Sequence, residues 1–420
     1  MVTEHTAPGR AADVVSVLAG AAMRGPLQDL LKPRGLRLER WQHLRTHHRP
    51  GGSVSALYRV HCRTAAPTSS GTGPDVPASA ALVLHIGATT ADAAAGPDGP
   101  HTASARIAGH RLRMWIHPHD PALPGLPWAT DAAAVGRDAF DSADPARLHL
   151  LAYRPLRRAV VQVEHPRGSA YLKLLPEEQL PALRRRHLLL ETAGVPAPRL
   201  LAAPEATARG VLMLSALPGA SLFRLLVEDG AAGVAPEQFL ELLDTLPVQA
   251  AELPRRRSWA EGAHGYAAAA AAVLPDEAVR IRALAAGVLE ALESTPAGPV
   301  VPVHGDFHEG NLLMTGTRVS GLLDVDALGP GHRVDDLACL IGHLAVLAAA
   351  NPSRPHLDHA LQEYRRVFET AVDPAALHAR AAGVVLSLVA GARGGHRGAR
   401  VHSARLRLET AQRLLRAASE

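Results

Sequence analysis

The 420-residue chain has few cysteines and no long hydrophobic run, and both scarcities exclude classes of protein. Its two cysteines, Cys62 and Cys339, cannot form a disulfide framework or a four-thiolate zinc site. Apolar runs such as 344–350 and 381–388 are shorter than the roughly 18–20 residues of a membrane span. We therefore predict a cytoplasmic protein with no membrane partner.

Charge of one sign is also scarce, because 44 Lys and Arg residues oppose 40 Asp and Glu residues. The arginine triplets 184–186 and 255–257 lack the interleaved aromatic side chains that stack on bases. We interpret these triplets as solvated helix faces and predict no nucleic-acid partner. The length itself predicts two or three domains with a substantial core.

Lysine is the scarcest cation, since only Lys32 and Lys173 occur among the 44 basic residues. A lysine kept in such a composition is a candidate for a task that arginine cannot perform, because its ammonium is a compact point charge. Lys32 lies in a turn-like segment, where chance explains it equally well. Lys173 lies inside the apolar stretch 171–175, so it is the stronger candidate.

Hydrophobic periodicity predicts an α+β part over 1–145, a β-rich part over 146–217 and a helical part over 218–420. Helices are expected within 1–31 and over 177–193. The prolines of 118–131 indicate a connector, so we expect residues 1–130 to be separable from the rest. Loops are expected over 64–80 and 89–100. Strands are expected at 36–41, 54–62, 81–86, 112–116, 148–153, 159–164, 170–175, 199–202 and 211–215.

The most informative segment is 303–311, Val-His-Gly-Asp-Phe-His-Glu-Gly-Asn, which an apolar hairpin and then Asp-Val-Asp follow. A turn centred between residues 317 and 318 would place Asn311 opposite Asp324, with Asp306 nearby. Amide and carboxylate oxygens are ligands that suit Mg²⁺ bound together with substrate phosphates. The order of Asp, Asn, hairpin and Asp is also that of the catalytic and metal-binding loops of kinases.

The form His-Gly-Asp-x-His-x-x-Asn at 304–311, with Asp335-Asp336-Leu337-Ala338 after it, resembles the aminoglycoside phosphotransferase and choline kinase superfamily. The resemblance extends over about residues 150–415. It implies an α+β, bilobal protein-kinase-like fold with a small β-rich N-lobe and a helical C-lobe. The α+β part over 1–145 would then be an N-terminal cap domain, followed by the N-lobe over 146–217 and the C-lobe over 218–420.

The same resemblance implies roles for individual residues. Asp306 would be the catalytic base, and Asn311 and Asp324 would bind Mg²⁺ together with ATP. Lys173 would bind the ATP phosphates, and the hinge that binds adenine would include Ser215 and Leu217. Asp336, His304 and His308 would support the loop structurally. Asp326 would either bind the metal directly or support the residues that bind it.

Two features depart from the kinase pattern. The helix over 177–193 has no acidic residue at its centre to pair with Lys173, which leaves Glu178 at its start. Arg154-Pro155-Leu156-Arg157-Arg158 replaces the glycine-rich loop, so Arg157 or Arg158 either contacts phosphate or is a surface charge. These departures favour an alternative, a nucleotide-binding pseudokinase that acts as a regulatory or partner-binding module. The short distance from Asp326 to Asp336 leaves no room for the activation segment of a protein kinase.

The phosphate acceptor is predicted from charge alone. Residues 375–420 contain eight arginines and two glutamates, which disfavours a polycationic aminoglycoside. We expect a hydroxyl of a sugar or of another neutral or anionic small molecule. His117-Pro118-His119-Asp120 has the spacing of metal ligands, but 23 histidines make such clusters common, and we expect no zinc site there.

Overall fold

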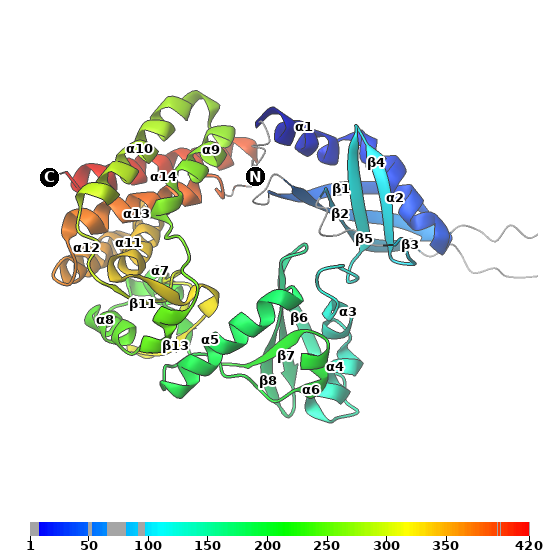
Figure 1. Ribbon diagram of the computed structural model, residues 1–420, viewed down its shortest axis with the longest axis horizontal. Helices are drawn as coiled ribbons and strands as arrows, with labels where there is room; N and C mark the ends of the chain where they lie inside the picture. The colour runs from blue at the N-terminus through cyan, green and yellow to red at the C-terminus, as the bar shows by residue number, and fades with distance from the viewer. Residues whose placement is uncertain are drawn as a thin grey trace, which may run out of the picture. The chain divides into compact units, whose positions relative to one another are not determined.

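The computed structural model describes residues 8–48, 53–64, 81–90, 97–392, 394 and 396–419 (Figure 1). Most of the loop expected over 64–80, and half of that expected over 89–100, lie outside these residues. The chain forms two units, one of Met1–Pro181 with Leu201–Ser215 and one of Ala182–Leu200 with Ala216–Glu420. The division of the N-terminal unit at residue 145, into cap and N-lobe, stays a prediction.

The N-terminal unit begins with a five-stranded antiparallel sheet in the order β1-β2-β3-β5-β4. Every second side chain of β2 is buried, and these side chains pack with apolar residues of two helices in one core. The sequence did not predict β4, because its alternating positions carry the small residues Ala103 and Ala105. The elements are α1 (Pro8–Ala19), α2 (Arg24–Leu31), β1 (Leu36–His48), β2 (Val54–Thr64), β3 (Ala81–Thr89), β4 (Thr102–Ile107) and β5 (His110–Ile116).

A second sheet of the same unit has four antiparallel strands in sequence order. They are β6 (Arg147–Arg154), β7 (Arg158–His165), β8 (Gly168–Leu174) and β9 (Val211–Ser215). Strand β7 alternates strictly between buried and half-buried residues, as expected for one face on a core. The strand expected over 199–202 is wrong: the short helix α6 (Pro204–Ala208) precedes β9, and Leu201 donates one backbone hydrogen bond to Met213.

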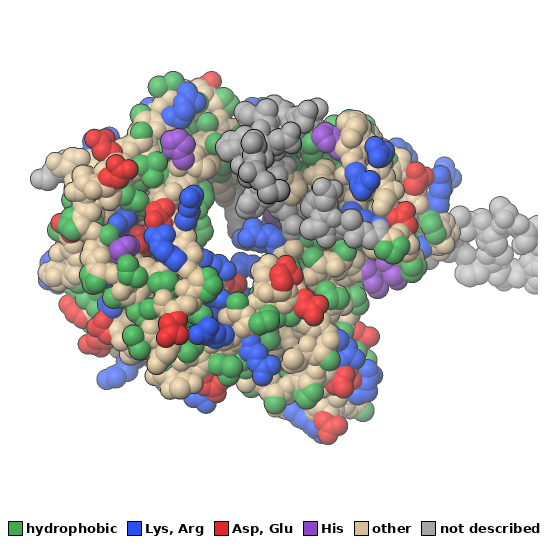
Figure 2. Space-filling model, in the orientation of Figure 1, with side chains coloured by type: hydrophobic (Ala, Val, Ile, Leu, Met, Phe, Trp, Pro, Cys, Tyr) green, Lys and Arg blue, Asp and Glu red, His purple; other side chains and the backbone are tan. Residues whose placement is uncertain are grey.

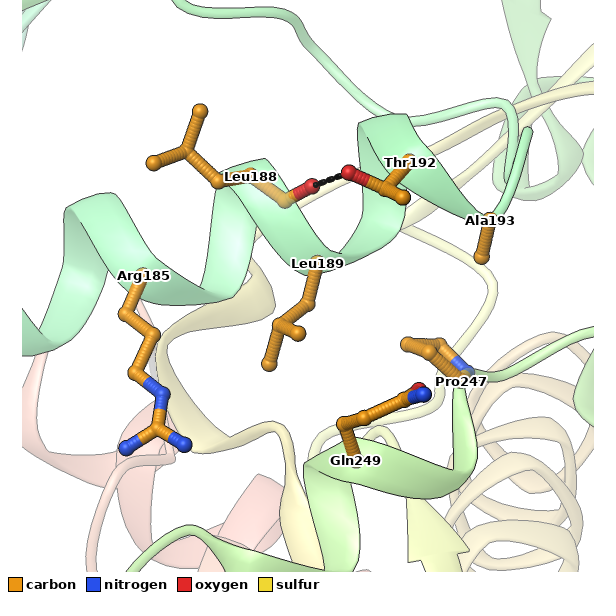
Figure 3. Close-up of a pocket in the computed structure, with 7 residues that line it drawn as sticks. All are labelled: Arg185, Leu188, Leu189, Thr192, Ala193, Pro247 and Gln249. Atoms are coloured by element: carbon orange, nitrogen blue, oxygen red, sulfur yellow. Dashed lines mark hydrogen bonds between the residues drawn. The ribbon is translucent and has the colours of Figure 1, made fainter.

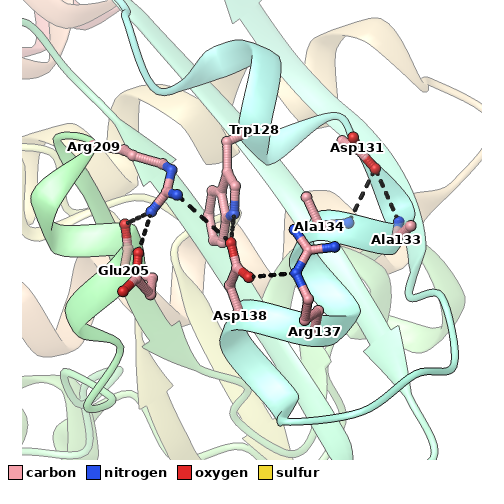
Figure 4. Close-up of polar contacts among 8 residues, drawn as sticks. All are labelled: Trp128, Asp131, Ala133, Ala134, Arg137, Asp138, Glu205 and Arg209. Atoms are coloured by element: carbon pink, nitrogen blue, oxygen red, sulfur yellow. Dashed lines mark hydrogen bonds and ion pairs between the residues drawn. The ribbon is translucent and has the colours of Figure 1, made fainter.

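The proline-rich segment 118–131 is part of the core beneath this second sheet. Its side chains Leu123, Leu126 and Trp128 are buried in one core with residues of the sheet. The helices α3 (Leu126–Ala129) and α4 (Ala132–Phe140) also contribute residues to this core. Trp128 Nε1 donates a 2.9 Å hydrogen bond to Asp138 on α4 (Figure 4). The expectation of a connector is therefore wrong, because these apolar residues are needed to cover the sheet.

The C-terminal unit is mainly helical, as predicted, and it carries two small antiparallel sheets. Its helices are α5 (Leu180–Thr192), α7 (Leu222–Asp229), α8 (Glu237–Asp244), α9 (Ala263–Val273), α10 (Ala278–Ser294), α11 (Arg333–Ala350), α12 (Pro355–Phe368), α13 (Pro374–Val389) and α14 (Arg397–Ala417). The first two residues of α5 belong to the other unit. The sheets are formed by β10 (Ala220–Ser221), β12 (Leu312–Thr315) and β13 (Arg318–Leu322), and by β11 (Val300–Val303) and β14 (Gly329–His332).

The α+β class is thus confirmed, with β-rich structure first and helical structure after it. Most residues of helix α13 are buried. Its small Ala, Gly and Val side chains let neighbouring helices approach closely. Within the described residues, every helix is too short or too polar to cross a bilayer.

Candidate active site

The loop 304–311 lies between β11 and β12, and a buried carboxylate fixes its first residues. Asp336, in the first turn of α11, accepts hydrogen bonds from the backbone N–H groups of His304 at 2.7 Å and Gly305 at 2.8 Å. Burial raises the pKa of Asp336 to about 7, although the two backbone hydrogen bonds oppose that shift. The carboxylate therefore holds the backbone immediately before Asp306, which is the contact that a bracing role requires.

His304 ties the same loop to the end of β13. Its Nε2 donates to the carbonyl of Leu323 at 2.9 Å, and its Nδ1 accepts from the backbone N–H of Asp306 at 3.3 Å. These two bonds need a neutral imidazole with its proton on Nε2. Complete burial lowers the pKa of His304, which is consistent with that neutral form.

Gly305 is a position where the loop passes close to the segment after Asp324. Its φ of +80° belongs to the left-handed region, and an added Cβ would lie 2.9 Å from both Cβ and the carbonyl oxygen of Ala327. The next apolar residue, Phe307, is fully buried and forms an edge contact with Phe239. Glycine and phenylalanine thus fix the loop, while Asp306 between them remains half-buried.

Asn311 is joined directly to Asp306. Its Nδ2 donates to the carbonyl of Asp306 at 2.9 Å, so the oxygen of the same amide is the atom suited to a cation. The predicted pairing of Asn311 with Asp324 is wrong by one residue. Leu312 pairs with Leu322, and the backbone N–H of Leu323 donates to the carbonyl of Asn311 at 2.8 Å.

The reason is a tight turn at 316–317 and a register shift between Leu313 and Met314. Asp324 therefore follows the pair of strands, with left-handed dihedrals of φ +53° and ψ +54°. Aspartate adopts this region more readily than most residues with a Cβ, but it is still a strained conformation. Asp306, Asn311 and Asp324 nevertheless lie on directly connected segments of the C-terminal unit.

The other predicted cofactor residues fall on both units. Lys173 lies on β8 with 6% of its surface exposed, and it pairs with Val160 of β7 and Leu212 of β9. Ser215 ends β9 in the same sheet, whereas Leu217 belongs to the C-terminal unit and lies against Gly321 of β13. Glu178 is exposed in the 3₁₀ turn before α5.

Arg186 was missed by the sequence analysis, which interpreted its triplet as solvated. It is 4% exposed, and its Nε donates to the carbonyl of Leu328 at 2.9 Å. Burial is the main reason that its pKa is lowered; Arg256 adds to that shift and Asp326 opposes it. The missed signal is helical spacing, because Leu183, Arg186 and Leu190 share one buried face of α5.

Residues 255–257 are exposed, as predicted, but they lie in a loop and not on a helix face. Arg186 therefore acts differently from the other five arginines of the two triplets. It attaches α5 to the segment that follows Asp324 and Asp326.

His308, Glu309 and His343 form the one metal-like cluster among the described residues. Nδ1 of His343 lies 3.4 Å from Oε2 of Glu309, which is 7% exposed. However, the two imidazole rings are stacked at 4.4 Å with an angle of 11°, and a metal must lie in the plane of each ligating ring. His308 Nδ1 also accepts a hydrogen bond from Gly310. Both features disfavour a metal site.

The cluster is better described as a buried carboxylate paired with histidine. Burial opposes ionisation of Glu309, but His343 and His308 outweigh it and lower the pKa of this carboxyl. Burial, and then His343, lowers the pKa of His308 to about 4. His308 is therefore neutral at pH 7, and its hydrogen bond with Gly310 helps to shape the loop before Asn311.

A separate cavity of about 420 Å³ lies between α5 and the segment 247–249 (Figure 3). It is lined mainly by apolar atoms, and it contains none of the predicted site residues. Its lining residues are Arg185, Leu188, Leu189, Thr192, Ala193, Pro247 and Gln249.

A model of the phosphotransferase enzyme family matches residues 155–377, which is more than half of the chain. The matched segment contains Lys173, Asp306, Asn311 and Asp324. No curated protein matches the chain.

Solved structures with distant similarity include aminoglycoside phosphotransferase APH(3″)-Id from Streptomyces rimosus, which is 20% identical, covers 60% of this chain and 96% of its own, and has a TM-score of 0.42. A choline/ethanolamine kinase family protein from Mesorhizobium loti is 18% identical, over 65% of this chain and 92% of its own, with a TM-score of 0.42. Aminoglycoside phosphotransferase APH(4)-Ia with AMP-PNP and hygromycin B is 15% identical, covers 68% of this chain and 99% of its own, and has a TM-score of 0.44.

Proposed function

The chain belongs to the phosphotransferase enzyme family, and on this premise we propose that it transfers the γ-phosphate of ATP to a hydroxyl of a small molecule, with Mg²⁺ as cofactor. The observation that carries the proposal is the fixed geometry of the loop 304–311. Asp336 and His304 hold the backbone around Asp306, and Asn311 is hydrogen-bonded to Asp306 beside the segment that bears Asp324.

The donor set fits magnesium better than zinc. The amide oxygen of Asn311 and the carboxylate of Asp324 are hard oxygen ligands, which Mg²⁺ prefers when it also binds phosphates. The ion would neutralise part of the phosphate charge. Lys173 would contribute a further positive charge toward the phosphates, and the hinge at Ser215 and Leu217 would bind the adenine.

Asp306 would accept the proton of the acceptor hydroxyl. As that oxygen forms its bond to the γ-phosphorus, the bond between this phosphorus and the bridging oxygen breaks and ADP leaves. Asp306 suits this role, because it is only half-buried and hydrogen bonds to Asp336 and His304 hold the backbone around it.

We propose a sugar or another neutral or anionic acceptor rather than an aminoglycoside. The support is electrostatic: the basic residues of α14 include Arg397, Arg400, Arg405, Arg413 and Arg416, which are exposed. Exposed charges of one sign repel a polycation over distances of about one Debye length, ~8–10 Å, without direct contact.

A cytoplasmic location is part of the same proposal, as is the absence of membrane and nucleic-acid partners. Cys62 and Cys339 are both free and buried, which fits a reducing compartment. Basic and acidic side chains are both distributed over the face drawn in Figure 2.

The second candidate function is a nucleotide-binding pseudokinase. The observation that favours it is the turn at 154–158, where Arg, Pro and Leu replace the glycines that approach phosphates in kinases. Binding of ATP without transfer of its phosphate would support this alternative.

Asp306→Asn tests the catalytic assignment. With Mg²⁺-ATP and an extract of small metabolites as acceptors, we expect ADP release to fall by ~10²–10⁴, the usual contribution of a general base. Affinity for Mg²⁺-ATP should be kept, because Asn311 and Asp324 remain. Asp358→Asn, an exposed residue on α12, is the control and should leave both quantities unchanged. A near wild-type rate for Asp306→Asn would contradict the assignment.

A further inference from the structure

The turn between β6 and β7, residues 154–158, is held by a residue from outside its own sheet. The backbone N–H of Leu156 donates to Oδ2 of Asp120 at 2.8 Å, and the hydroxyl of Tyr153 donates to the same oxygen at 2.8 Å. The other carboxylate oxygen accepts from the backbone N–H of Ala122 at 2.9 Å. Asp120 is only 2% exposed, so these bonds are formed away from water.

The contact continues to the five-stranded sheet. Trp115 is the penultimate residue of β5 and pairs with Gly87 of β3. Its Nε1 donates a hydrogen bond to the hydroxyl of Tyr153 at 2.9 Å. Trp115 is fully buried and packs with Leu156 in a small core of their own. An added Cβ at Gly87 would lie 2.3 Å from the indole ring, so glycine is required there to seat Trp115.

The conformation of the turn shows that it depends on these contacts. Leu156 has a φ of +60°, a left-handed conformation that costs a residue with a bulky side chain free energy. Such a conformation persists only where the surroundings fix it, and here Asp120 holds the N–H while Trp115 covers the side chain. Burial, and then the neighbouring Asp120, raises the pKa of Tyr153 far above its usual range, so its hydroxyl stays protonated and can donate.

The turn has a known counterpart in kinases. There the turn between the first two strands of the N-lobe sheet covers the phosphates, and glycines allow its backbone to approach them. In this chain the same turn lacks glycine and lies beside β7, whose Val160 pairs with Lys173. A turn that cannot adapt through glycine must instead be set in the right place by its surroundings.

We propose that Asp120 is a positioning residue for nucleotide binding, which acts with Tyr153 and Trp115 to hold the 154–158 turn where it contacts the phosphates of ATP. The inference rests on the proposed function. It gives the N-terminal α+β part a task, because that part supplies Asp120 and Trp115, which hold a turn that has no glycine.

Asp120→Asn is the test, with Mg²⁺-AMP-PNP and adenosine as the two calorimetric probes. The amide keeps the size of the carboxylate but replaces one acceptor oxygen with an NH₂ group. That group cannot accept a hydrogen bond from the N–H of Leu156 or of Ala122, so the turn should loosen. We expect the dissociation constant for Mg²⁺-AMP-PNP to rise about tenfold, the effect of one unsatisfied buried hydrogen-bond group. The dissociation constant for adenosine should stay within about twofold, because adenosine carries no phosphate.

Asp138→Asn is the matched control, since Asp138 accepts from the indole of Trp128 in the same unit but takes no part in holding the turn (Figure 4). It should leave both constants unchanged. Tyr153→Phe is the milder variant, because it keeps the bond from Leu156 to Asp120, and we expect a smaller rise for Mg²⁺-AMP-PNP alone.

The outcomes are distinguishable. Equal Mg²⁺-AMP-PNP affinity in wild type, Asp120→Asn and Tyr153→Phe would overturn the inference and leave the proposed function intact. Equal losses for adenosine and Mg²⁺-AMP-PNP would also overturn it, because they would indicate general damage to the fold. Failure of the wild-type chain to bind Mg²⁺-AMP-PNP would contradict the proposed function, and the inference with it.

Discussion

The loop 304–311 and the turn 154–158 are held by the same physical device in two different units. In each, a buried carboxylate accepts hydrogen bonds from backbone N–H groups: Asp336 from His304 and Gly305, and Asp120 from Ala122 and Leu156. Asp336 lies within the segment that matches the family, whereas Asp120 precedes it. The comparison teaches that a loop can be equally well fixed by residues inside a family motif and by residues outside it.

The two carboxylates differ in their remaining partners. Asp120 also accepts from the hydroxyl of Tyr153, which links it to Trp115 and hence to a second sheet. Asp336 is placed by its own helix, where the first-turn position suits an acidic residue. Loss of Asp120 should therefore separate two parts of one unit, while loss of Asp336 should act locally.

Deletion of residues 1–130 should have the largest effect, because it removes the support of the turn 154–158 and leaves that of the loop 304–311. It removes Asp120 together with Leu123, Leu126 and Trp128, which are buried under the four-stranded sheet. We expect the N-terminal unit to lose its cooperative unfolding transition in calorimetry. A truncated chain that keeps a cooperative transition for the four-stranded sheet at the wild-type temperature would show instead that residues 1–130 are separable.

Asp336→Ala should act next most strongly, on stability. It leaves the buried N–H group of His304 and the part-buried N–H group of Gly305 without this acceptor, at a cost of ~1–3 kcal/mol for the buried group and less for the other. Asp336→Asn keeps one acceptor and should lose about half as much free energy of unfolding in urea titrations. Equal stability of the two variants would contradict the role of both hydrogen bonds.

Asp324→Asn tests whether the segment beside the loop held by Asp336 binds Mg²⁺. Loss of a residue that only supports a metal ligand weakens metal binding by ~10–100-fold. Removal of the charged ligand itself should therefore weaken Mg²⁺ binding by at least this factor. Excess Mg²⁺ should partly restore the rate of ADP release, which it should not do for Asp306→Asn. A titration of rate against Mg²⁺ concentration that is the same as wild type would exclude Asp324 as a ligand.

Lys173→Ala tests nucleotide binding by the unit that contains the turn 154–158. Of the four changes, it should have the smallest effect. Loss of its charge should weaken Mg²⁺-ATP binding about tenfold in calorimetry, as for one charge-assisted hydrogen bond. Lys32→Ala is the natural control, because Lys32 forms only an exposed ion pair with Asp29. If both variants bind Mg²⁺-ATP as the wild type does, Lys173 is not a nucleotide ligand.

The sequence predicted most elements of the fold, because periodicity reports burial of one face. It correctly anticipated β6 to β9, α5 and the β12–β13 hairpin within a few residues. It failed over 118–131, where four prolines suggested a connector although Leu126 and Trp128 are buried. Proline restricts the backbone but does not prevent a short helix from packing on a sheet.

The site was predictable where its chemistry is concentrated in one motif, and much less so elsewhere. The hairpin register was missed by one residue, because a bulge leaves no mark in the hydrophobic pattern. Arg186 and Asp120 were missed for another reason: both are charged residues whose burial depends on partners far away in the sequence. Helical spacing could have revealed Arg186. Asp120 was noticed only for the metal-like spacing of 117–120, which does not reveal its hydrogen bonds to Tyr153 and Leu156.

Phosphoryl transfer to a small molecule is the central claim, and γ-labelled ATP tests it most directly. The full chain, incubated with labelled ATP, Mg²⁺ and a fractionated metabolite extract, should place the label in a phosphate ester of a small molecule. The label should require Mg²⁺ and should be lost with Asp306→Asn. Tight binding of ATP with all of the label remaining on ATP would contradict the claim and favour the pseudokinase.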